Sequence, residues 1–260
     1  MTEQIKSHPK SFQVGKWFGP SLGTVLLKEE QLSAFKKMTD ALLSDENTES
    51  HGAHLAGKIK KEMRIYRSDM IEYGVNDFLE GCVRTYVTEA VKQHEHLKEG
   101  SVVTSSVNSA WVVSQYENEY NPIHNHTGCE VSGVLYLKMP NVKGRRVGPN
   151  GILGEKKKDK PDSDGNIVFV YNAPSQRNGN PLENGLLELQ PHDGVMFLFP
   201  SYLLHVVYPF MGKEERRCIA FNAVYRVNDK NNVYVGGSTE GMVNKTFYDM
   251  EKHIGSTHYE

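Results

Sequence analysis

Apolar residues recur at two different periods along this chain, one in each half. The first half shows the three- and four-residue spacing of amphipathic helices. One helix is expected to begin after Lys28, and its apolar face is formed by Leu32, Phe35, Met38 and Leu42. A second is expected from near Asn76 to His94. Residues 1–100 are therefore predicted to form a mostly helical scaffold that packs against the rest of the same domain.

From Val102 the pattern changes to short strands, rich in β-branched and aromatic residues and bounded by Gly, Pro, Asn and Asp. The segments are SVVTSSVNSAWVVSQYENEY, SGVLYLKMP, GNIVFVYNAP, GLLELQP, GVMFLFPS, HVVYPF and RRCIAFNAVYRV. Helices followed by six to eight short strands predict an α+β protein, with an antiparallel sandwich or barrel covered by helices on one face. We assign this β core to residues 101–228.

Three segments fall outside the strand pattern. Residues 143–164 are charged and glycine-rich and are predicted to be a loop inserted into the β core. Together with the turn at 172–184 they are expected to face a substrate, because binding sites are commonly shaped by loops on a rigid scaffold. The three lysines at 156–158 are interpreted as a solvated loop face rather than a phosphate site. Residues 229–260 are polar and are assigned to a C-terminal tail.

Composition narrows the class of protein. The 260 residues are 38% hydrophobic, which is enough for a sizeable core, and the formal net charge of −2 argues against a general nucleic-acid binder. No apolar run approaches the ~18–20 residues that span a bilayer, and the N-terminus has no apolar signal core. Three widely separated cysteines without CxxC spacing indicate free thiols. These features predict a cytoplasmic protein that does not associate with membranes.

The chemistry is expected at three histidines. His124 and His126 are two residues apart, so a regular strand would point both rings to the same side. His205 follows about 80 residues later, at the end of the apolar segment FLFPSYLLH. Two ligands from one strand and one from a distant strand would hold one octahedral ion and leave three positions open, as in non-haem Fe(II) oxygenases. By itself an HxH pair is more often a surface or hydrogen-bonded pair.

An arginine strengthens this interpretation. Arg216 lies eleven residues after His205 and opens the strand RRCIAFN. A period of two places Arg216 on one face with the small residues Cys218 and Ala220, whereas Arg217 shares the other face with bulky apolar residues. A guanidinium beside small side chains suits a bound carboxylate, which it binds through two parallel hydrogen bonds. The alternative is a surface ion pair with the neighbouring glutamates.

The motifs HNHxxxxxSGVLYL, DGVMFLFPSYLLHVVYP and ERRCIAFN, taken in this order, resemble the Fe(II)/2-oxoglutarate-dependent oxygenases common in phages and marine bacteria. These are relatives of the prolyl 4-hydroxylases, and the resemblance covers roughly residues 110–225 without the insertion. It implies a double-stranded β-helix (jelly roll) with N-terminal helices packed on one face. It also implies Fe(II) held by His124 and His205, and 2-oxoglutarate whose far carboxylate is bound by Arg216 and Tyr136.

The sequence departs from the family at the carboxylate ligand, because His126 stands where Asp or Glu is usual. The resemblance leaves three possibilities for the third ligand: His126, Glu130 or water. Three histidines and Glu130 are also the ligand set of a cupin, a metal-dependent dioxygenase or isomerase that needs no 2-oxoglutarate. A jelly-roll binding protein without metal chemistry is a further alternative, since a fold does not define a function. Arg216 and the segment around His205 favour the oxygenase.

The resemblance implies a hydroxylase that converts 2-oxoglutarate to succinate and CO2. Its substrate is expected to be a small molecule or a peptide, and neither its identity nor the oligomeric state can be read from the sequence. A phage origin would place the enzyme in the cytoplasm of the host cell.

Overall fold

The computed structural model describes residues 9–16, 19–92, 100–140, 165–171, 185–228 and 233–235. Its helices are α1 (Glu29–Ser44), the single 3-10 turn η1 (Gly52–His54), α2 (Arg67–Glu72) and α3 (Asn76–Lys92). Its strands are β1 (Ser11–Lys16), β2 (Ser21–Leu26), β3 (Lys61–Ile65), β4 (Val102–Gln115), β5 (Asn121–His124), β6 (Val131–Lys138), β7 (Ile167–Val170), β8 (Leu186–Leu189), β9 (Val195–Pro200), β10 (Leu204–Val207), β11 (Arg216–Asn228) and β12 (Val233–Val235). The two helices expected from the sequence are α1 and α3.

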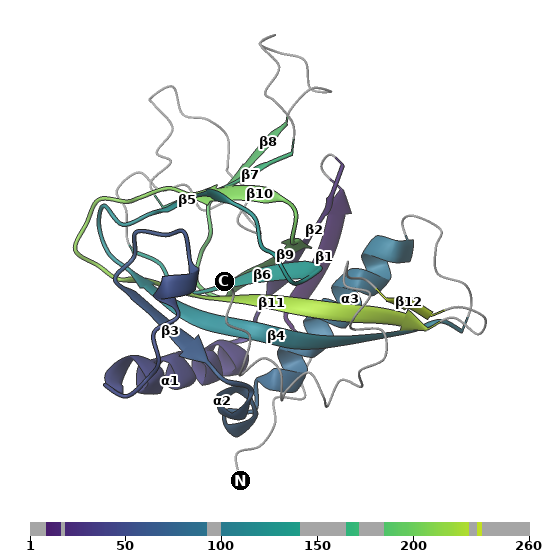
Figure 1. Ribbon diagram of the computed structural model, residues 1–260, viewed down its shortest axis with the longest axis horizontal. Coiled ribbons are helices and arrows are strands. Elements are labelled where there is room, and N and C mark those ends of the chain that lie inside the picture. The colour runs from purple at the N-terminus through teal and green to yellow at the C-terminus, as the bar shows by residue number, and fades with distance from the viewer. Residues whose placement is uncertain are drawn as a thin grey trace.

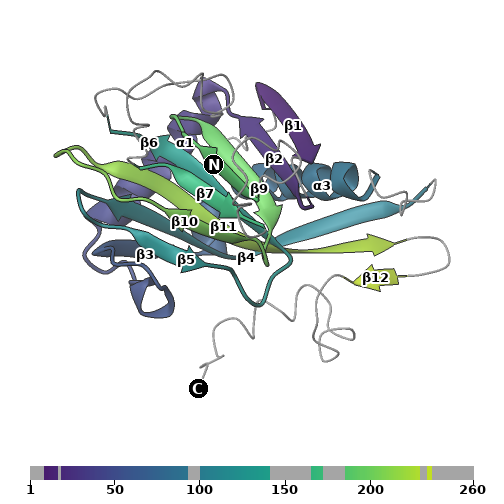
Figure 2. The same ribbon diagram turned by 90° about the horizontal axis from the view of Figure 1, so that it is seen from above.

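The strands form two sheets that lie one over the other (Figures 1 and 2). The large sheet has the order β1-β2-β9-β6-β11-β4-β3, with β12 paired to β11, and the small sheet has the order β5-β10-β7-β8. From β4 to β11 the chain passes back and forth between them, so that β4, β6, β9 and β11 lie in the large sheet and the other four strands in the small one. All pairings are antiparallel. This arrangement is a double-stranded β-helix, as the sequence predicts.

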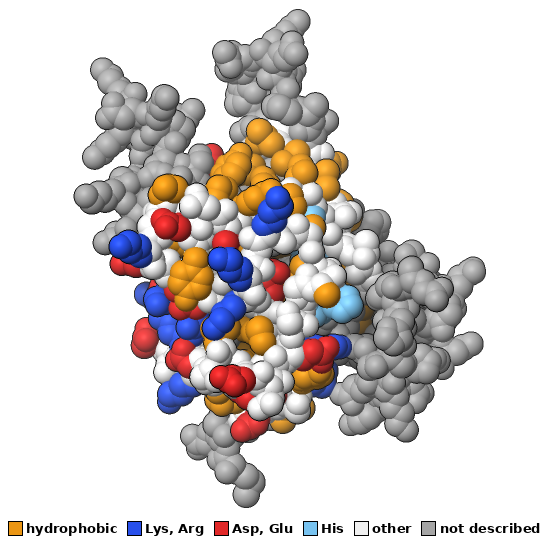
Figure 3. All heavy atoms as spheres, turned by 60° about the vertical axis from the view of Figure 1, so that its left-hand side comes forward, with side chains coloured by type: hydrophobic (Ala, Val, Ile, Leu, Met, Phe, Trp, Pro, Cys, Tyr) orange, Lys and Arg blue, Asp and Glu red, His pale blue; other side chains and the backbone are white. Residues whose placement is uncertain are grey.

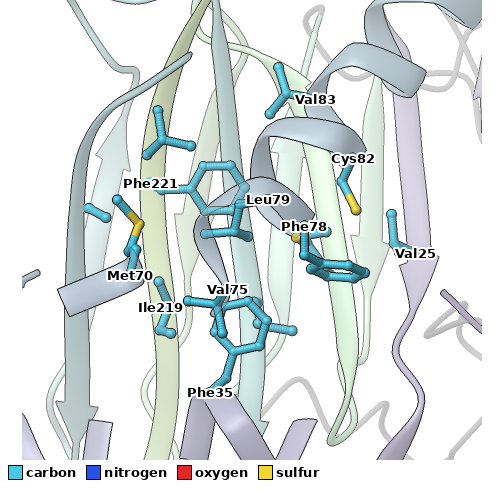
Figure 4. Packing of buried hydrophobic residues seen from close by; sticks show 14 of the residues in the cluster. Val25, Phe35, Met70, Val75, Phe78, Leu79, Cys82, Val83, Ile219 and Phe221 are labelled. Atoms are coloured by element: carbon cyan, nitrogen blue, oxygen red, sulfur yellow. The ribbon is translucent and has the colours of Figure 1, made fainter. Parts of the chain in front are cut away.

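The main core lies between the helices and the outer face of the large sheet, as Figure 4 shows for α1, α2, α3 and the strands behind them. Ile219 and Phe221 of β11 point into this core and pack with Phe35 of α1 and Leu79 of α3. The ring of Phe221 lies so close to Gly133 on β6 that a Cβ atom there would come within 2.2 Å of it. A glycine at this position therefore lets the aromatic ring pack directly on the neighbouring strand.

A second core lies between the two sheets. It contains Tyr136 of β6, Phe169 of β7, Phe199 of β9 and Cys218 of β11. Neighbouring residues of β11 thus belong to different cores, because successive side chains of a strand point to opposite faces. The side of β11 that carries Arg216 and Cys218 faces the interior of the β-helix.

The N-terminal hundred residues contain more strand than the sequence pattern indicates. β1, β2 and β3 all join the large sheet, with β2 paired to β9 and β3 to β4. On β2, Leu22 belongs to the core between the sheets and Val25 to the core under the helices. Because apolar residues are buried on both faces of β2, its sequence lacks the alternation of a half-buried strand. The insertion at 143–164, the turn at 172–184 and most of the C-terminal tail lie outside the described residues.

Hydrophobic side chains gather at the top of the face in Figure 3, over the small sheet. The exposed apolar residues of its strands include Ile123 on β5, Leu186 on β8 and Leu204 on β10. In the part of the chain that the structure describes, no helix has both the length and the apolar character needed to cross a membrane.

Candidate metal centre

The three histidines singled out in the sequence meet between the two sheets. His124 is the last residue of β5 and lies directly opposite His205 on the adjacent strand β10. The ring centroids of His124 and His205 are 4.2 Å apart, and that of His126 is 5.2 Å from His205. The candidate ligand nitrogens of all three rings lie within 4.8 Å of one another. The fold thus brings together side chains that could share one ion.

His126 reaches this cluster by a route that the sequence did not predict. The expectation of a regular strand through Asn125 is wrong, because β5 ends at His124 and the next residues are irregular. The backbone N–H of His126 instead donates to the carbonyl oxygen of Ser201, which follows β9. The ring of His126 therefore faces the other two histidines because the loop is fixed to the opposite sheet, and not because of strand periodicity.

Hydrogen bonds at Nδ1 define which nitrogen of each ring is available. Nδ1 of His124 is 2.7 Å from the carbonyl oxygen of Pro122, and Nδ1 of His205 is 3.0 Å from that of Leu203. Nδ1 of His126 is 2.6 Å from the amide oxygen Oδ1 of Asn222. A carbonyl or amide oxygen only accepts, so each Nδ1 carries the proton and each Nε2 keeps its lone pair. This is the tautomer that binds a metal through Nε2.

Burial keeps these rings neutral. Burial, together with the neighbouring His124 and His126, lowers the pKa of His205 to about 3. Burial also lowers the pKa of His126 to about 4, although the bond to Asn222 acts in the opposite direction, and it lowers the pKa of His124. A metal ion must displace any proton from a ligand nitrogen. Near neutral pH the three nitrogens are therefore ready to bind one.

Arg216 lies inside the β-helix with most of its hydrogen-bonding capacity unused. Its side chain is 2% exposed, and Nη1 donates to Oε1 of Gln115 on β4. Nε and Nη2 are buried and have no hydrogen-bond partner among the described residues. A buried guanidinium without an anion costs several kcal/mol, so this site suits an anionic ligand. The carboxylate of 2-oxoglutarate fits, because it can accept two parallel hydrogen bonds from one guanidinium.

Arg217 is placed differently, as the strand parity predicts. Its Nε and Nη2 donate to the two carboxylate oxygens of Glu215 at 2.8 and 2.9 Å, and its Nη1 contacts Asp40 of α1. These contacts lie on the helix side of the sheet. Arg217 thus has two carboxylate partners within the protein, whereas Arg216 has none among the residues that the structure describes.

Tyr136 lies beside Arg216, where the resemblance expects it. The guanidinium carbon of Arg216 is 5.1 Å from the centroid of the Tyr136 ring, and Tyr136 itself is fully buried. Gln115 was not found from the sequence, although it is directly paired with Arg216 in the sheet. Its amide N–H donates to the backbone oxygen of Glu119, which orients the amide oxygen toward Arg216. Gln115 therefore holds the guanidinium in place.

Glu130, the alternative ligand, is not part of the histidine cluster. Its backbone bridges Ala223 and Ser201, and the backbone N–H of Tyr225 hydrogen-bonds its carboxyl group. Burial raises the pKa of this carboxyl to about 7. The cupin arrangement, in which Glu130 completes the ligand set, is therefore not the one that this fold presents.

An aromatic stack extends from the histidine cluster toward η1. The ring of Trp111 on β4 stacks on His126 with centroids 5.9 Å apart, and its neighbour His51 stacks on Trp111 at 5.0 Å. Neither residue belongs to a motif that marks it in the sequence. Trp111 shares its strand face with the inward-pointing residues of β4, but His51 precedes a short 3-10 turn and had no recognisable motif.

A further buried carboxyl group lies on β3. Glu62 on β3 lies opposite Val113, is 1% exposed, and its Oε1 has no hydrogen-bond partner among the described residues. Burial raises the pKa of Glu62 to about 7, and the charge of Glu119 adds to the effect. Because the folded pKa exceeds the ordinary value of 4.5, the folded state loses stability as the pH rises from about 4.5 through 7.

We therefore expect Glu62→Gln to make the protein more stable than wild type at pH 8, by up to about 3 kcal/mol at 1.36 kcal/mol per pKa unit. The two proteins should be nearly equal at pH 4.5, where the wild-type carboxyl is protonated. Urea unfolding at both pH values measures the difference. Glu72→Gln, at an exposed position at the end of α2, is the control. A Glu62→Gln advantage that does not grow with pH would contradict the assignment.

One protein-family model matches the β core. Residues 109–222 match a family model described as "Putative 2OG-Fe(II) oxygenase". The matched segment runs from β4 to β11 and contains all three histidines and Arg216. Over this segment the chain is therefore similar to the 2OG-Fe(II) oxygenases. No curated protein matches the chain. The branch found in phages and marine bacteria stays a prediction.

Solved structures of similar shape include a prolyl-4-hydroxylase from Pseudomonas putida, with 14% identity and a TM-score of 0.44 over 77% of this chain and 91% of that one. AviO1 from Streptomyces viridochromogenes Tue57 has 12% identity and a TM-score of 0.45, and the match covers 83% of this chain and 90% of AviO1. HygX from Streptomyces hygroscopicus, with nickel and 2-oxoglutarate bound, has 12% identity and a TM-score of 0.44. This match covers 78% of this chain and 81% of HygX. These likenesses are distant, and the strand order described above defines the fold without them.

Proposed function

We propose that this protein is an Fe(II)- and 2-oxoglutarate-dependent hydroxylase, in which His124, His126 and His205 bind the iron. The proposal rests on two features that lie inside the same β-helix, a cluster of histidines and a buried arginine. Three neutral histidines have ligand nitrogens within 4.8 Å of one another, and a buried arginine has two N–H donors without a partner among the described residues. The first feature suits a divalent metal and the second suits a carboxylate.

Within this proposal each residue has a defined task. The histidines bind the ion through Nε2 while Nδ1 holds each ring by a hydrogen bond. Arg216 binds the far carboxylate of 2-oxoglutarate through Nε and Nη2, with Tyr136 beside it. Phe169 and Phe199 pack against His205 and exclude water from that side.

The iron, when bound, supplies the oxidising chemistry that hydroxylates a C–H bond while 2-oxoglutarate is converted to succinate and CO2. The three-histidine ligand set has no charge of its own, so the ion keeps its full positive charge until 2-oxoglutarate binds. This favours binding of the anionic cosubstrate. The substrate is proposed to be a small molecule or a peptide.

Succinate release from 2-oxoglutarate tests the proposal. The protein is loaded with Fe(II) without oxygen, supplied with 2-oxoglutarate and air, and screened with mixtures of metabolites and peptides. We expect one bound iron per chain and succinate formation that rises with a particular substrate. Iron binding without any succinate would contradict the use of 2-oxoglutarate. Absence of metal binding would favour a jelly-roll binding protein.

A further inference from the structure

We propose that Asn222 is the residue that makes His126 a metal ligand, by fixing its tautomer and its orientation from the opposite sheet. This inference rests on the proposed function, because it concerns how the third ligand of that metal site is held. It assigns a role to a side chain that is 96 residues away from His126 in the sequence.

The three histidines differ in how their rings are held. His124 and His205 each donate Nδ1–H to a backbone carbonyl two residues earlier in the chain, namely those of Pro122 and Leu203. These bonds are local and survive any change of side chain at their acceptors. His126 lies beyond the end of β5 and its ring is bonded to a side chain, Oδ1 of Asn222, at 2.6 Å. Of the three rings, it is the one whose orientation depends on another side chain.

Asn222 is itself held in position. The hydroxyl of Ser132 on β6 donates to the same oxygen, Oδ1, at 3.2 Å. Asn222 pairs with Ser132 on one side and with Ser109 on β4 on the other, so small side chains flank it on both neighbouring strands. An amide oxygen can only accept, so both the Ser132 hydroxyl and the His126 ring donate to it. The proton of His126 is therefore kept on Nδ1.

The pairing of β4 with β11 is irregular at this point. Asn222 pairs with Ser109 and the next residue, Ala223, pairs with Val107, so that Asn108 of β4 is left over as a bulge. A bulge bends its strand and redirects the neighbouring side chains, and bulges occur often beside functional sites. Asn222 thus lies next to an irregularity in the pairing of β11 with β4.

The identity of the side chain also matters for charge. Histidine ligands commonly donate their second nitrogen to a carboxylate, which makes the ring a stronger ligand. An amide oxygen orients the ring in the same way but brings no charge. With Asn222 the site keeps a neutral set of ligands and a neutral acceptor behind His126. An aspartate at position 222 is therefore expected to orient the ring equally well and to strengthen metal binding.

Titration with Co(II) alone, as a spectroscopic substitute for Fe(II), tests this role without any turnover. Asn222→Leu keeps a similar volume but removes the acceptor, and should weaken Co(II) binding by about 10- to 100-fold. Its visible absorption spectrum should show the loss of one nitrogen ligand. Asn222→Asp should bind as tightly as wild type or more tightly. Ser132→Ala removes the second donor but leaves Asn222 in contact with His126, and should bind close to wild type.

A double-mutant cycle separates positioning from other effects. If Asn222 acts through His126, then Asn222→Leu has no further effect on Co(II) affinity once His126→Ala is present. Additive losses, wild-type affinity of Asn222→Leu, or an equal loss in Asn222→Asp would each overturn the inference. A wild-type protein that binds no Co(II) or Fe(II) would instead reject the proposed function. Melting curves identify a variant that fails to fold. If Asn222→Leu does not fold, the Co(II) affinity of Asn222→Asp is compared with that of wild type instead.

Discussion

Replacing His205 with alanine is expected to abolish iron binding and 2-oxoglutarate turnover. His205 is the most buried of the three histidines, at 4% exposed, and its ring lies within about 5 Å of the other two. A ring in this position cannot be replaced by either neighbour. The loss of iron affinity should be about 100-fold or more, because residues that only orient a metal ligand already contribute 10- to 100-fold.

Iron content after anaerobic loading and dialysis measures this effect, followed by succinate formation. Because His205 packs against Phe169 and Phe199, the alanine variant also leaves a cavity, and His205→Gln is a second variant that nearly preserves the volume. His192→Ala is the matched control, since His192 follows β8 and lies outside the cluster. A His205 variant with full iron content and turnover would remove the basis of the proposed metal centre.

Replacing Arg216 with lysine is expected to weaken apparent 2-oxoglutarate affinity by about 10-fold or more, which corresponds to the ~1.4 kcal/mol of one charge-assisted hydrogen bond. Lysine keeps the positive charge but loses the planar pair of donors, Nε and Nη2, that a carboxylate would accept from. It also loses the contact with Gln115 that holds the guanidinium in place. The effect should therefore appear mainly as a raised KM for 2-oxoglutarate.

Arg217→Lys is a matched control on the adjacent residue of the same strand. Arg217 pairs with Glu215 and Asp40 on the helix side of the sheet, so its replacement should leave the KM for 2-oxoglutarate unchanged. A titration of succinate release against 2-oxoglutarate compares the two variants. If Arg217→Lys raised the KM and Arg216→Lys did not, the assignment of the cosubstrate carboxylate to Arg216 would be wrong.

The two faces of β11 show that a local sequence pattern can predict on which side of a strand a residue lies. The sequence places Arg216 and Arg217 on opposite sides, and the structure buries one between the sheets and pairs the other with α1. The alternation follows from the geometry of an extended chain, which needs no information about the partners of the strand. The same reasoning gave a wrong account of His126, because it assumed a strand where the chain leaves the sheet.

The N-terminal strands could not be predicted from their local sequence pattern. β2 was not predicted because Leu22 and Val25 are both buried although they face different cores, so the alternating pattern is absent. It becomes a strand by pairing with β9, far away in the sequence. Such pairing depends on the rest of the sheet, which is why strand formation is more dependent on context than helix formation.

By itself the sequence indicated the class of the protein and the three histidines of its candidate metal site. The order of the histidine, apolar and arginine motifs pointed to an iron and 2-oxoglutarate enzyme, and the family match agrees. Only the tertiary structure decided which side chains support that site. Asn222 reaches His126 and Gln115 holds Arg216 because of the register between strands. Register is set by packing of the whole chain, so contacts between distant strands cannot be read from spacing along one of them.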